Sequence, residues 1–237
     1  MKLTWGIIGL GWLGESLAES VRADGDEAWG THRSSFDFER DELPRDHCDI
    51  LFLNTPPLTR MAPPDYVAKV HASGRVFFVS STSVYGEVSG RVTEETAPQP
   101  ATESGKWLLE TETALRKKFG DRLTVIRPGG LIGGQRHPVK ILSARGTAGG
   151  AGLPVNLIHR SDVVGIVRAL ARSGPLATVN AVAPHHPAKD VYYNEWAAKL
   201  GLPSIAFEPS KEPAREIESL HLARIYPKWI CPHLDSF

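Results

Sequence analysis

Three features that would each mark a particular class of protein are scarce or missing in this sequence. Its 237 residues include only two cysteines, Cys48 and Cys231, and their spacing matches no metal-binding motif. We expect both to be reduced thiols of the core type. There is also no excess of charge, because 27 lysines and arginines balance 27 aspartates and glutamates. A nucleic acid or an anionic membrane is therefore not an expected partner, whereas a small molecule is.

A long hydrophobic run is missing as well. No segment approaches the roughly 18 unbroken apolar residues of a membrane-spanning helix. The N-terminal stretch MKLTWGIIGLGWLGES is apolar after one lysine, but glycines interrupt it and no small-residue cleavage site follows. It therefore does not resemble a signal peptide, and we expect a cytoplasmic protein. With 41% hydrophobic residues, the chain can form one α/β domain over residues 1–237.

Short apolar runs alternate with segments of helical periodicity along most of the chain. This alternation predicts a doubly wound parallel sheet of the Rossmann type, with helices on both faces. The predicted strands are 3–10, 27–33, 48–57, 75–82, 122–130 and 177–184, and the predicted helices are 12–24, 65–74, 103–118 and 159–174.

The last quarter of the chain breaks this rhythm with extra prolines and a lone helix within 194–203. We expect parts of about 131–158 and 185–237 to form a small substrate lobe over the carboxyl edge of the sheet. Within it, the glycine-rich segment 146–154 has neither the Lys-Ser/Thr ending nor the preceding strand of a phosphate-binding P-loop. We interpret this segment as a flexible loop over the cleft.

The first predicted strand runs into a G-x-G-x-x-G motif that opens a helix, which is the context that dinucleotide binding requires. Gly9 would permit the tight turn, Gly11 would let the backbone approach a diphosphate, and Gly14 would let the helix pack on the strand. The free N–H groups of the helix start, around Trp12 and Leu13, would face the phosphates. The alternative is a strand-to-helix turn that binds nothing.

The second predicted strand lacks a feature that NAD-binding proteins usually have. An acidic residue normally ends this strand and holds the ribose 2′-hydroxyl, but Asp24 and Asp26 lie in the turn before the strand. The strand ends instead at Arg33, which with His32 and Ser34 could receive a 2′-phosphate. We therefore expect NADP, with NAD as the other option. A solvated charge at the end of a strand is the alternative for Arg33.

The polar strand ends complete the predicted coenzyme site, because ligands of such sheets bind beyond the carboxyl ends of the strands. Two further strands end in polar or proline-rich sequence, at NTPP and at SSTSVYG. The residues expected there to contact the coenzyme are Asn54, Thr55, Pro56 and Ser80.

With the glycine motif, SSTSVYG (80–86) resembles the extended short-chain dehydrogenase/reductase superfamily, which includes sugar-nucleotide epimerases and dehydratases. Segments 125–138, 156–167 and 179–184 extend the resemblance over nearly the whole chain. The sequence is most similar to a short, atypical bacterial subgroup that carries GLGWLG and STSVYG. Like members of that subgroup, this chain has a link between its second and third predicted strands that is too short for a helix–strand unit. The resemblance implies a nicotinamide coenzyme and a polar, nucleotide-linked small molecule as substrate.

The superfamily's catalytic residues are a Ser or Thr and the Tyr and Lys of a Y-x-x-x-K motif, in which the lysine lowers the pKa of the tyrosine. The resemblance places Ser81 at the serine position and Lys106 at the lysine position. The tyrosine position is Thr102, whose hydroxyl is too weak an acid to ionise near neutral pH. Lys106 could keep a coenzyme-ribose role, or it could be an ordinary helix charge after an N-cap at Ser104.

Other side chains could face the substrate, although none forms a specific catalytic arrangement. These candidates are Tyr85, His137, Asn156 and His159. Packing in the core is the alternative for Tyr85 and His159. Adjacent histidines at 185–186 do not have metal-ligand spacing, so no metal site is expected.

Two functional hypotheses remain open. One is an NADP-dependent oxidoreductase or epimerase-like enzyme with an altered proton relay. The other is a binding or regulatory module that keeps the dinucleotide site but no chemistry. The helix that includes 105–115 is apolar enough to allow a homodimer.

Overall fold

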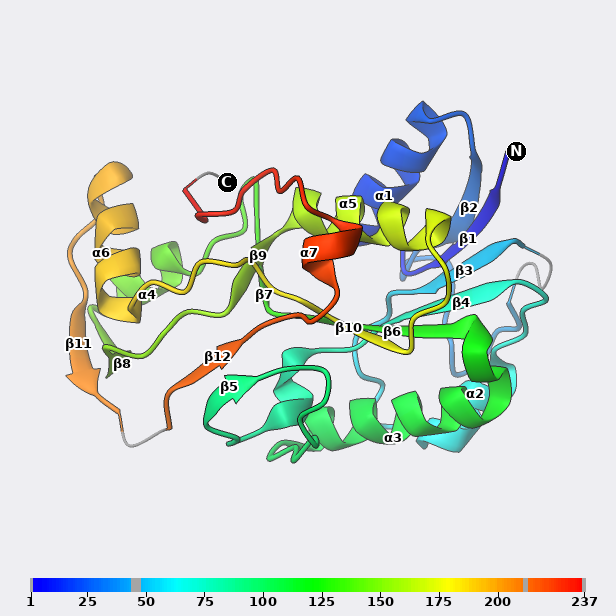
Figure 1. Cartoon of the computed structure of the whole chain (residues 1–237), viewed down its shortest axis with the longest axis horizontal. Helices are drawn as coiled ribbons and strands as arrows, with labels where there is room; N and C mark the ends of the chain where they lie inside the picture. The colour runs from blue at the N-terminus through cyan, green and yellow to red at the C-terminus, as the bar shows by residue number, and fades with distance from the viewer. Residues whose placement is uncertain (1, 44–47, 211–212, 236–237) are drawn as a thin grey trace.

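The computed structural model describes residues 2–43, 48–210 and 213–235. Its centre is a six-stranded sheet in the order β10-β6-β4-β3-β1-β2, and every neighbouring pair is parallel. This confirms the predicted doubly wound parallel sheet (Figure 1). The strands are β1 (Thr4–Ile8), β2 (Glu27–Thr31), β3 (Ile50–Leu53), β4 (Arg75–Val79), β6 (Leu123–Pro128) and β10 (Thr178–Ala181).

Helices cover both faces of the sheet. One face carries α1 (Trp12–Ala23), α5 (Arg160–Arg172) and the short α7 (Leu222–Ile225). The other carries α2 (Pro63–Lys69) and α3 (Glu103–Phe119) (Figure 1). Each helix turns an apolar stripe toward the sheet, so two hydrophobic clusters form on either side of strands whose residues are almost all buried.

Strand order reverses at β1, which lies between β2 and β3. Ligands of doubly wound sheets bind at the carboxyl edge beside such a reversal, because the connections on its two sides diverge and leave a crevice. The glycine motif follows β1 and Asn54 follows β3, so both lie at this edge. The described part of the link between β2 and β3, residues 32–43 and 48–49, contains no helix or strand.

Helix α2 begins earlier than the sequence predicts, at Pro63, and ends at Lys69. Proline suits the first turn of a helix, since the amide it lacks would have no partner there. Val70 is already extended, with φ −80° and ψ 113°, so the predicted continuation to residue 74 does not form.

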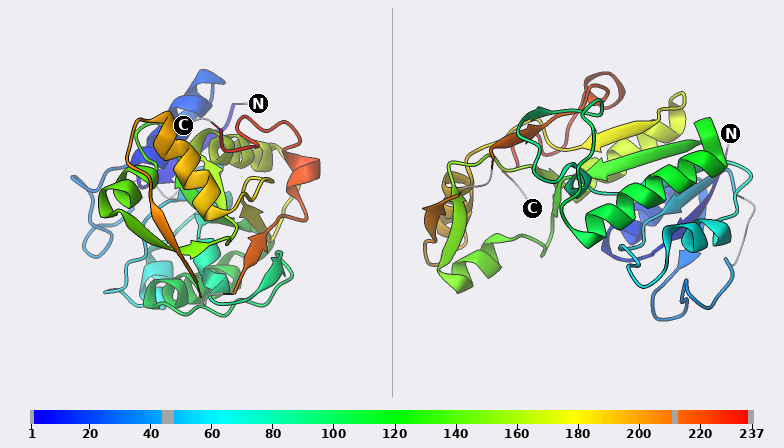
Figure 2. Two further views of the ribbon diagram at one scale, coloured as in Figure 1. Left: turned by 90° about the vertical axis from the view of Figure 1, so that its left-hand side faces the viewer. Right: turned by 90° about the horizontal axis from the view of Figure 1, so that it is seen from below.

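A separate group of elements packs at one end of the molecule (Figure 2). It consists of α4 (Val139–Arg145), β8 (Thr147–Ala151), α6 (Lys189–Lys199) and β11 (Ala206–Pro209), and it has its own core around Tyr192 and Trp196. Strand β8 pairs with β11. The prediction of a flexible loop over 146–154 is therefore wrong, because a partner more than 50 residues away supplies the hydrogen bonds of β8.

Two more pairs of short strands lie beside the main sheet. Strand β7 (Gly130–Ile132) pairs with β9 (Leu157–His159), and β5 (Gly90–Val92) pairs with β12 (Arg215–Ile217). The C-terminal segment thus returns from the end group toward the main sheet, where α7 contacts α5. Cys48 and Cys231 are both buried and form no disulfide bond with each other. Every helix in the described ranges is too short or too polar to span a lipid bilayer.

Candidate functional site

The glycine motif has a different geometry at each of its three glycines. Gly9 has φ +105°, and a Cβ atom there would lie 2.4 Å from the Asn54 carbonyl oxygen. A Cβ atom on Gly14 would lie 2.2 Å from the Gly9 carbonyl oxygen, so only glycine allows α1 to approach β1 this closely. A Cβ atom on Gly11 would meet no protein atom within 4 Å. Gly9 and Gly14 thus serve the fold, and the space in front of Gly11 is open to a ligand.

Hydrogen bonds from the neighbouring strands fix this loop. The Asn54 side-chain amide donates to the Gly9 carbonyl oxygen at 3.0 Å, and the Gly9 amide donates to Thr31 Oγ1 at 3.3 Å. Helix α1 then begins at Trp12 without a side-chain cap. Its first amide groups are free of intrahelical partners and carry partial positive charge, so the loop can accept a diphosphate.

The remaining residues predicted to bind coenzyme differ in their surroundings. Leu13 is buried in the core, so only its backbone amide faces the loop. Arg33 and Ser34 follow β2 and are exposed, and among the described residues the Arg33 guanidinium has no hydrogen-bond or ion-pair partner. Thr55 Oγ1 lies 3.1 Å from the Tyr66 hydroxyl, and the exposed Pro56 follows it.

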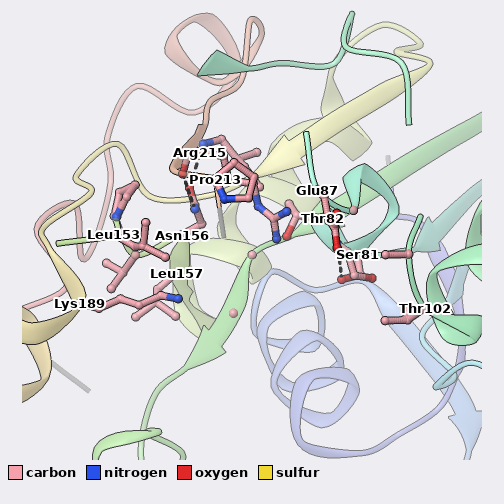
Figure 3. Close-up of a pocket in the computed structure, with 18 of the residues that line it drawn as sticks. Ser81, Thr82, Glu87, Thr102, Leu153, Asn156, Leu157, Lys189, Pro213 and Arg215 are labelled. Carbon is pink, nitrogen blue, oxygen red and sulfur yellow. Dashed lines mark hydrogen bonds between the residues drawn. The ribbon is translucent and has the colours of Figure 1, made fainter. Parts of the chain in front are cut away.

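A cavity of about 530 Å³ opens beside the carboxyl ends of β4 and β6 (Figure 3). Figure 3 shows the hydroxyl side chains of Ser81 and Thr102 on one wall and Lys189 on the opposite wall. The other polar or aromatic side chains that line it are those of Thr82, Ser83, Glu87, Asn156, Tyr193 and Arg215.

Both predicted catalytic hydroxyls cap helical turns. Ser81 Oγ accepts from the Ser83 amide at 3.1 Å and caps the 3₁₀ turn Thr82–Tyr85. Thr102 Oγ1 accepts from the Gly105 amide at 3.1 Å, so Thr102, and not Ser104, is the N-cap of α3. A capping hydroxyl accepts one backbone hydrogen bond and keeps its own proton to donate elsewhere.

Lys106 is the exposed member of the predicted trio. Its ammonium group lies 2.8 Å from Glu103 Oε1, and this hydrogen bond raises the pKa of the lysine above its ordinary value. Glu110 adds to the same effect. Lys106 does not line the cavity beside Ser81 and Thr102. The structure therefore brings two of the three positions together and leaves the lysine in a surface ion pair.

Ser80 and Tyr85 belong to a buried network below the cavity, not to its surface. Ser80 Oγ donates to Glu112 Oε1 at 2.5 Å, and Arg127 makes a two-point ion pair with Glu112 at 3.1 and 2.6 Å. Arg127 also donates to the Tyr85 hydroxyl at 2.9 Å, which in turn donates to Asn180 at 2.8 Å. Burial lowers the pKa of Arg127, but the hydrogen bonds and charge interactions with Glu112 and Tyr85 together outweigh burial and raise the pKa above its ordinary value.

This network corrects two expectations. Ser80 is 6% exposed and Tyr85 is fully buried, so neither side chain can reach a coenzyme or a substrate. Burial also raises the pKa of Tyr85, which makes its phenol a weaker acid. Tyr85 is therefore a packed core residue, which was the alternative interpretation, because its ring lies between the sheet and α3.

Of the other three candidates, only Asn156 lines the cavity. Its side chain donates to the Arg215 carbonyl oxygen at 3.0 Å and accepts from the Ile217 amide at 2.8 Å, so it ties β12 to the cavity wall. His137 is 5% exposed among aromatic rings, and burial lowers its pKa to about 4. It is therefore a neutral core residue and not a substrate contact.

His159 is the N-cap of α5, and its Nδ1 accepts from the Ser161 amide at 3.2 Å. With Asp162 and Cys231 it offers three ligand atoms within 4.8 Å of one another. The Asp162 carboxylate, however, accepts hydrogen bonds from the Tyr226 hydroxyl and from the amides of Ile230 and Cys231. Hydrogen bonds thus compensate this buried charge and attach the C-terminal segment to α5.

The cavity also contains side chains that the sequence analysis did not select. Lys189 and Tyr193 lie four residues apart on α6, so both face the cavity, and Arg215 enters it from β12. Burial raises the pKa of Tyr193 to about 12, so it is not a ready proton acceptor. Their i, i+4 spacing is the signal that points to them, but the sequence predicts this helix only within 194–203, which leaves both residues outside it.

The apolar side of α3, proposed for a homodimer, is covered within the chain. Trp107, Leu108 and Leu115 are buried, and the Trp107 indole donates to the Met61 carbonyl oxygen at 2.7 Å. Helix α2 packs against α3 on this side.

No protein-family model matches the chain. Protein YeeZ of Escherichia coli (strain K12) is 33% identical to it over 242 residues, which cover 88% of each chain. The chain belongs to the YeeZ family.

The chain shares its fold with solved structures that are described as epimerases or as epimerase/dehydratase proteins. A Methylobacillus flagellatus protein assigned as an NAD-dependent epimerase/dehydratase superposes with a TM-score of 0.74 at 22% identity, covering 98% of this chain and 94% of that one. MoeE5, in complex with UDP-glucuronic acid and NAD, has a TM-score of 0.76 at 17% identity and covers 94% and 92% of the two chains.

RMD from Pseudomonas aeruginosa, complexed with NADPH, has a TM-score of 0.69 at 15% identity and covers 94% and 91% of the two chains. These likenesses show a Rossmann-type fold for the YeeZ-family chain, and two of these solved structures contain a nicotinamide dinucleotide, NAD or NADPH. In that chain, the open space at Gly11 and the uncapped start of α1 fit the diphosphate of such a molecule.

Proposed function

We propose that this chain is an NADP-dependent oxidoreductase or epimerase-like enzyme that acts on a nucleotide-linked sugar without a catalytic tyrosine. The observation that carries the proposal is the glycine motif, in which Gly11 alone faces open space while Gly9 and Gly14 are fixed by the fold. The coenzyme loop and the polar cavity lie at the same edge of the sheet, so a bound coenzyme and a substrate would meet there.

The amide groups at the start of α1 would hold the diphosphate of the coenzyme. Arg33 would hold the 2′-phosphate, since its guanidinium is exposed at the end of β2 and no described residue pairs with it. When bound, the nicotinamide would supply reversible hydride transfer. No carboxylate ends β2 to receive the ribose 2′-hydroxyl of NAD. The end of β2 therefore favours NADP, whose 2′-phosphate Arg33 can bind.

The cavity is suited to an anionic, hydroxyl-rich substrate. Lys189 and Arg215 supply positive charge that could bind a diphosphate link, while Ser81, Ser83 and Thr102 supply hydroxyls. Structures with this fold include complexes of MoeE5 with UDP-glucuronic acid and with UDP-glucose, which supports the same class of substrate for this chain.

Proton transfer needs a group other than a phenol. Ser81 Oγ can donate to a substrate oxygen while it accepts from the Ser83 amide, which would orient that oxygen. Glu87 is the carboxylate on the cavity wall beside Thr82 (Figure 3), and we assign it the role of proton acceptor.

The second candidate is a non-catalytic dinucleotide-binding module. One observation favours it: Ser81 and Thr102 cap helical turns, and Lys106 pairs with Glu103 outside the cavity. The trio of the superfamily is therefore not assembled as a catalytic unit.

Calorimetric titration with NADPH and NADH, followed by turnover assays with UDP-glucose and UDP-glucuronic acid, separates these possibilities. An enzyme should show turnover that Ser81→Ala and Glu87→Gln each reduce by about a hundredfold or more. Thr113→Ala, at an exposed position of α3 that does not line the cavity, is the control and should leave turnover unchanged. Tight NADPH binding without turnover across the panel would favour the module, and absence of binding would overturn both candidates.

A further inference from the structure

Two arginines lie over the indole ring of Trp12, the residue that follows the second glycine of the motif. The Arg160 Cζ atom is 4.5 Å from the ring centroid, and the Arg136 Cζ atom is 5.2 Å from the same centroid. Arg160 also donates from Nη1 to the Trp12 carbonyl oxygen at 3.2 Å. The planar indole thus receives two guanidinium groups at distances typical of cation–π contacts.

Well-packed parts of the fold hold both arginines in this position. Arg160 is the first residue of α5, which packs beside α1. Arg136 ends a tight turn in which Gly133 and Arg136 exchange two backbone hydrogen bonds of 3.0 Å. Gly133 has φ +138°, and a Cβ atom there would lie 2.9 Å from His159 Nε2, so the turn is packed firmly against the start of α5.

The charge of the two arginines is not balanced by a nearby acid. Among the carboxylates of residues 2–43, 48–210 and 213–235, none forms a salt bridge with Arg136 or Arg160. Arg136 is exposed and Arg160 is half-buried, and the positive potential of Arg160 adds to the effect of burial in lowering the pKa of His159. Two unpaired positive charges therefore adjoin the open loop at Gly11.

We infer that Arg136, Arg160 and the Trp12 ring form a cationic clamp for the diphosphate of the dinucleotide. This inference rests on the proposed coenzyme site and adds side chains to a loop that otherwise offers only backbone amides. Both arginines can donate planar pairs of hydrogen bonds to phosphate oxygens while they remain stacked on the indole. Because Arg136 and Arg160 follow β7 and β9, the clamp would also couple coenzyme binding to the cavity wall that these strands form.

ADP-ribose is the appropriate probe, since it has the diphosphate but neither the nicotinamide nor a 2′-phosphate. Calorimetric titrations at several salt concentrations would compare the wild type with Arg136→Ala, Arg160→Ala, Arg160→Lys and the control Arg145→Ala. Arg145 is an exposed residue of α4 with no described partner. Each alanine substitution in the clamp should weaken ADP-ribose binding about tenfold or more and reduce the salt dependence of the dissociation constant.

Arg160→Lys should recover part of the affinity, because a charge remains without the planar pair of donors. Tryptophan fluorescence gives an independent signal. Ligand binding should change the tryptophan emission of the wild type through Trp12, and it should leave the emission of Trp12→Phe unchanged. Circular dichroism and the melting temperature confirm that each variant is folded. Wild-type affinity in both alanine variants would overturn the clamp and leave the coenzyme site intact. Absence of ADP-ribose and NADPH binding by the wild type would instead overturn the proposed function.

Discussion

The glycine loop (residues 9–14) and the cavity wall that carries the hydroxyl groups of Ser81 and Thr102 lie at the same edge of the sheet but are built in opposite ways. In the loop, two glycines are required by close backbone approaches, and the groups offered to a ligand are peptide amides. In the wall, the groups are the side chains of Ser81 and Thr102, which also cap helical turns, and Lys106 has paired with Glu103 at the surface.

The difference shows why one site keeps the superfamily's pattern and the other does not. A site made of backbone amides tolerates changes of side chain as long as the glycines remain. A site made of three side chains depends on each of them, and in this sequence the tyrosine position of that pattern is Thr102. Below the wall, the ion pair of Glu112 and Arg127 keeps the end of β4 in place whether or not catalysis survives.

The largest effect is expected at this buried ion pair. Arg127→Met should lower the free energy of unfolding by about 3–5 kcal/mol, because it leaves the Glu112 carboxylate buried without its partner. Urea denaturation would measure the loss. Lys106→Met, which breaks the exposed pair with Glu103, should produce no measurable change. Equal effects of the two substitutions would show that the network does not support the wall.

In the glycine loop, we expect one substitution to weaken ligand binding alone and another to weaken both binding and stability. Gly11→Ala should leave the melting temperature unchanged, since its Cβ atom meets no protein atom within 4 Å, and should weaken NADPH binding by roughly tenfold to a hundredfold. Gly9→Ala should reduce both, because Gly9 has φ +105° and Asn54 blocks the added atom. Calorimetry and thermal unfolding together test this. Full NADPH affinity in Gly11→Ala would contradict the proposed position of the diphosphate.

Coenzyme preference should depend on one side chain. Arg33→Ala is expected to weaken NADPH binding about tenfold and to leave NADH binding unchanged, since only NADPH has the 2′-phosphate. Titrations of both coenzymes against wild type and variant measure the ratio of affinities. An unchanged ratio would show that Arg33 is a solvated charge at the end of a strand.

The smallest effect concerns the threonine at the tyrosine position. Thr102→Ala should destabilise the fold by about 1 kcal/mol through loss of the α3 cap, whereas Thr102→Ser should retain most of the stability. Both stabilities can be read from urea denaturation. If Thr102→Ala instead abolishes turnover without altering stability, the hydroxyl acts on the substrate and the two regions are more alike than the structure indicates.

Local patterns predicted the central sheet well and the outer elements poorly. Strands such as Ile50–Leu53 are continuous apolar runs, and the glycine motif needs only a strand before it and a helix after it. Strand β8 is rich in glycine and has no such pattern, so its pairing with β11 could not be foreseen. The start of α6 at Lys189 was missed for a related reason, since the stretch before it has no cap residue and little amphipathic pattern.

The sequence by itself determined the parallel sheet, the glycine loop and the absence of tyrosine from position 102, because each depends on residue types at short, fixed spacing. Only the tertiary structure decided which side chains meet. It buried Tyr85 beneath Arg127, placed Lys189 and Arg215 in the cavity with Ser81, and brought Arg160 onto Trp12 from 148 residues away. Such contacts depend on the packing of whole elements, so no local pattern of residues contains them.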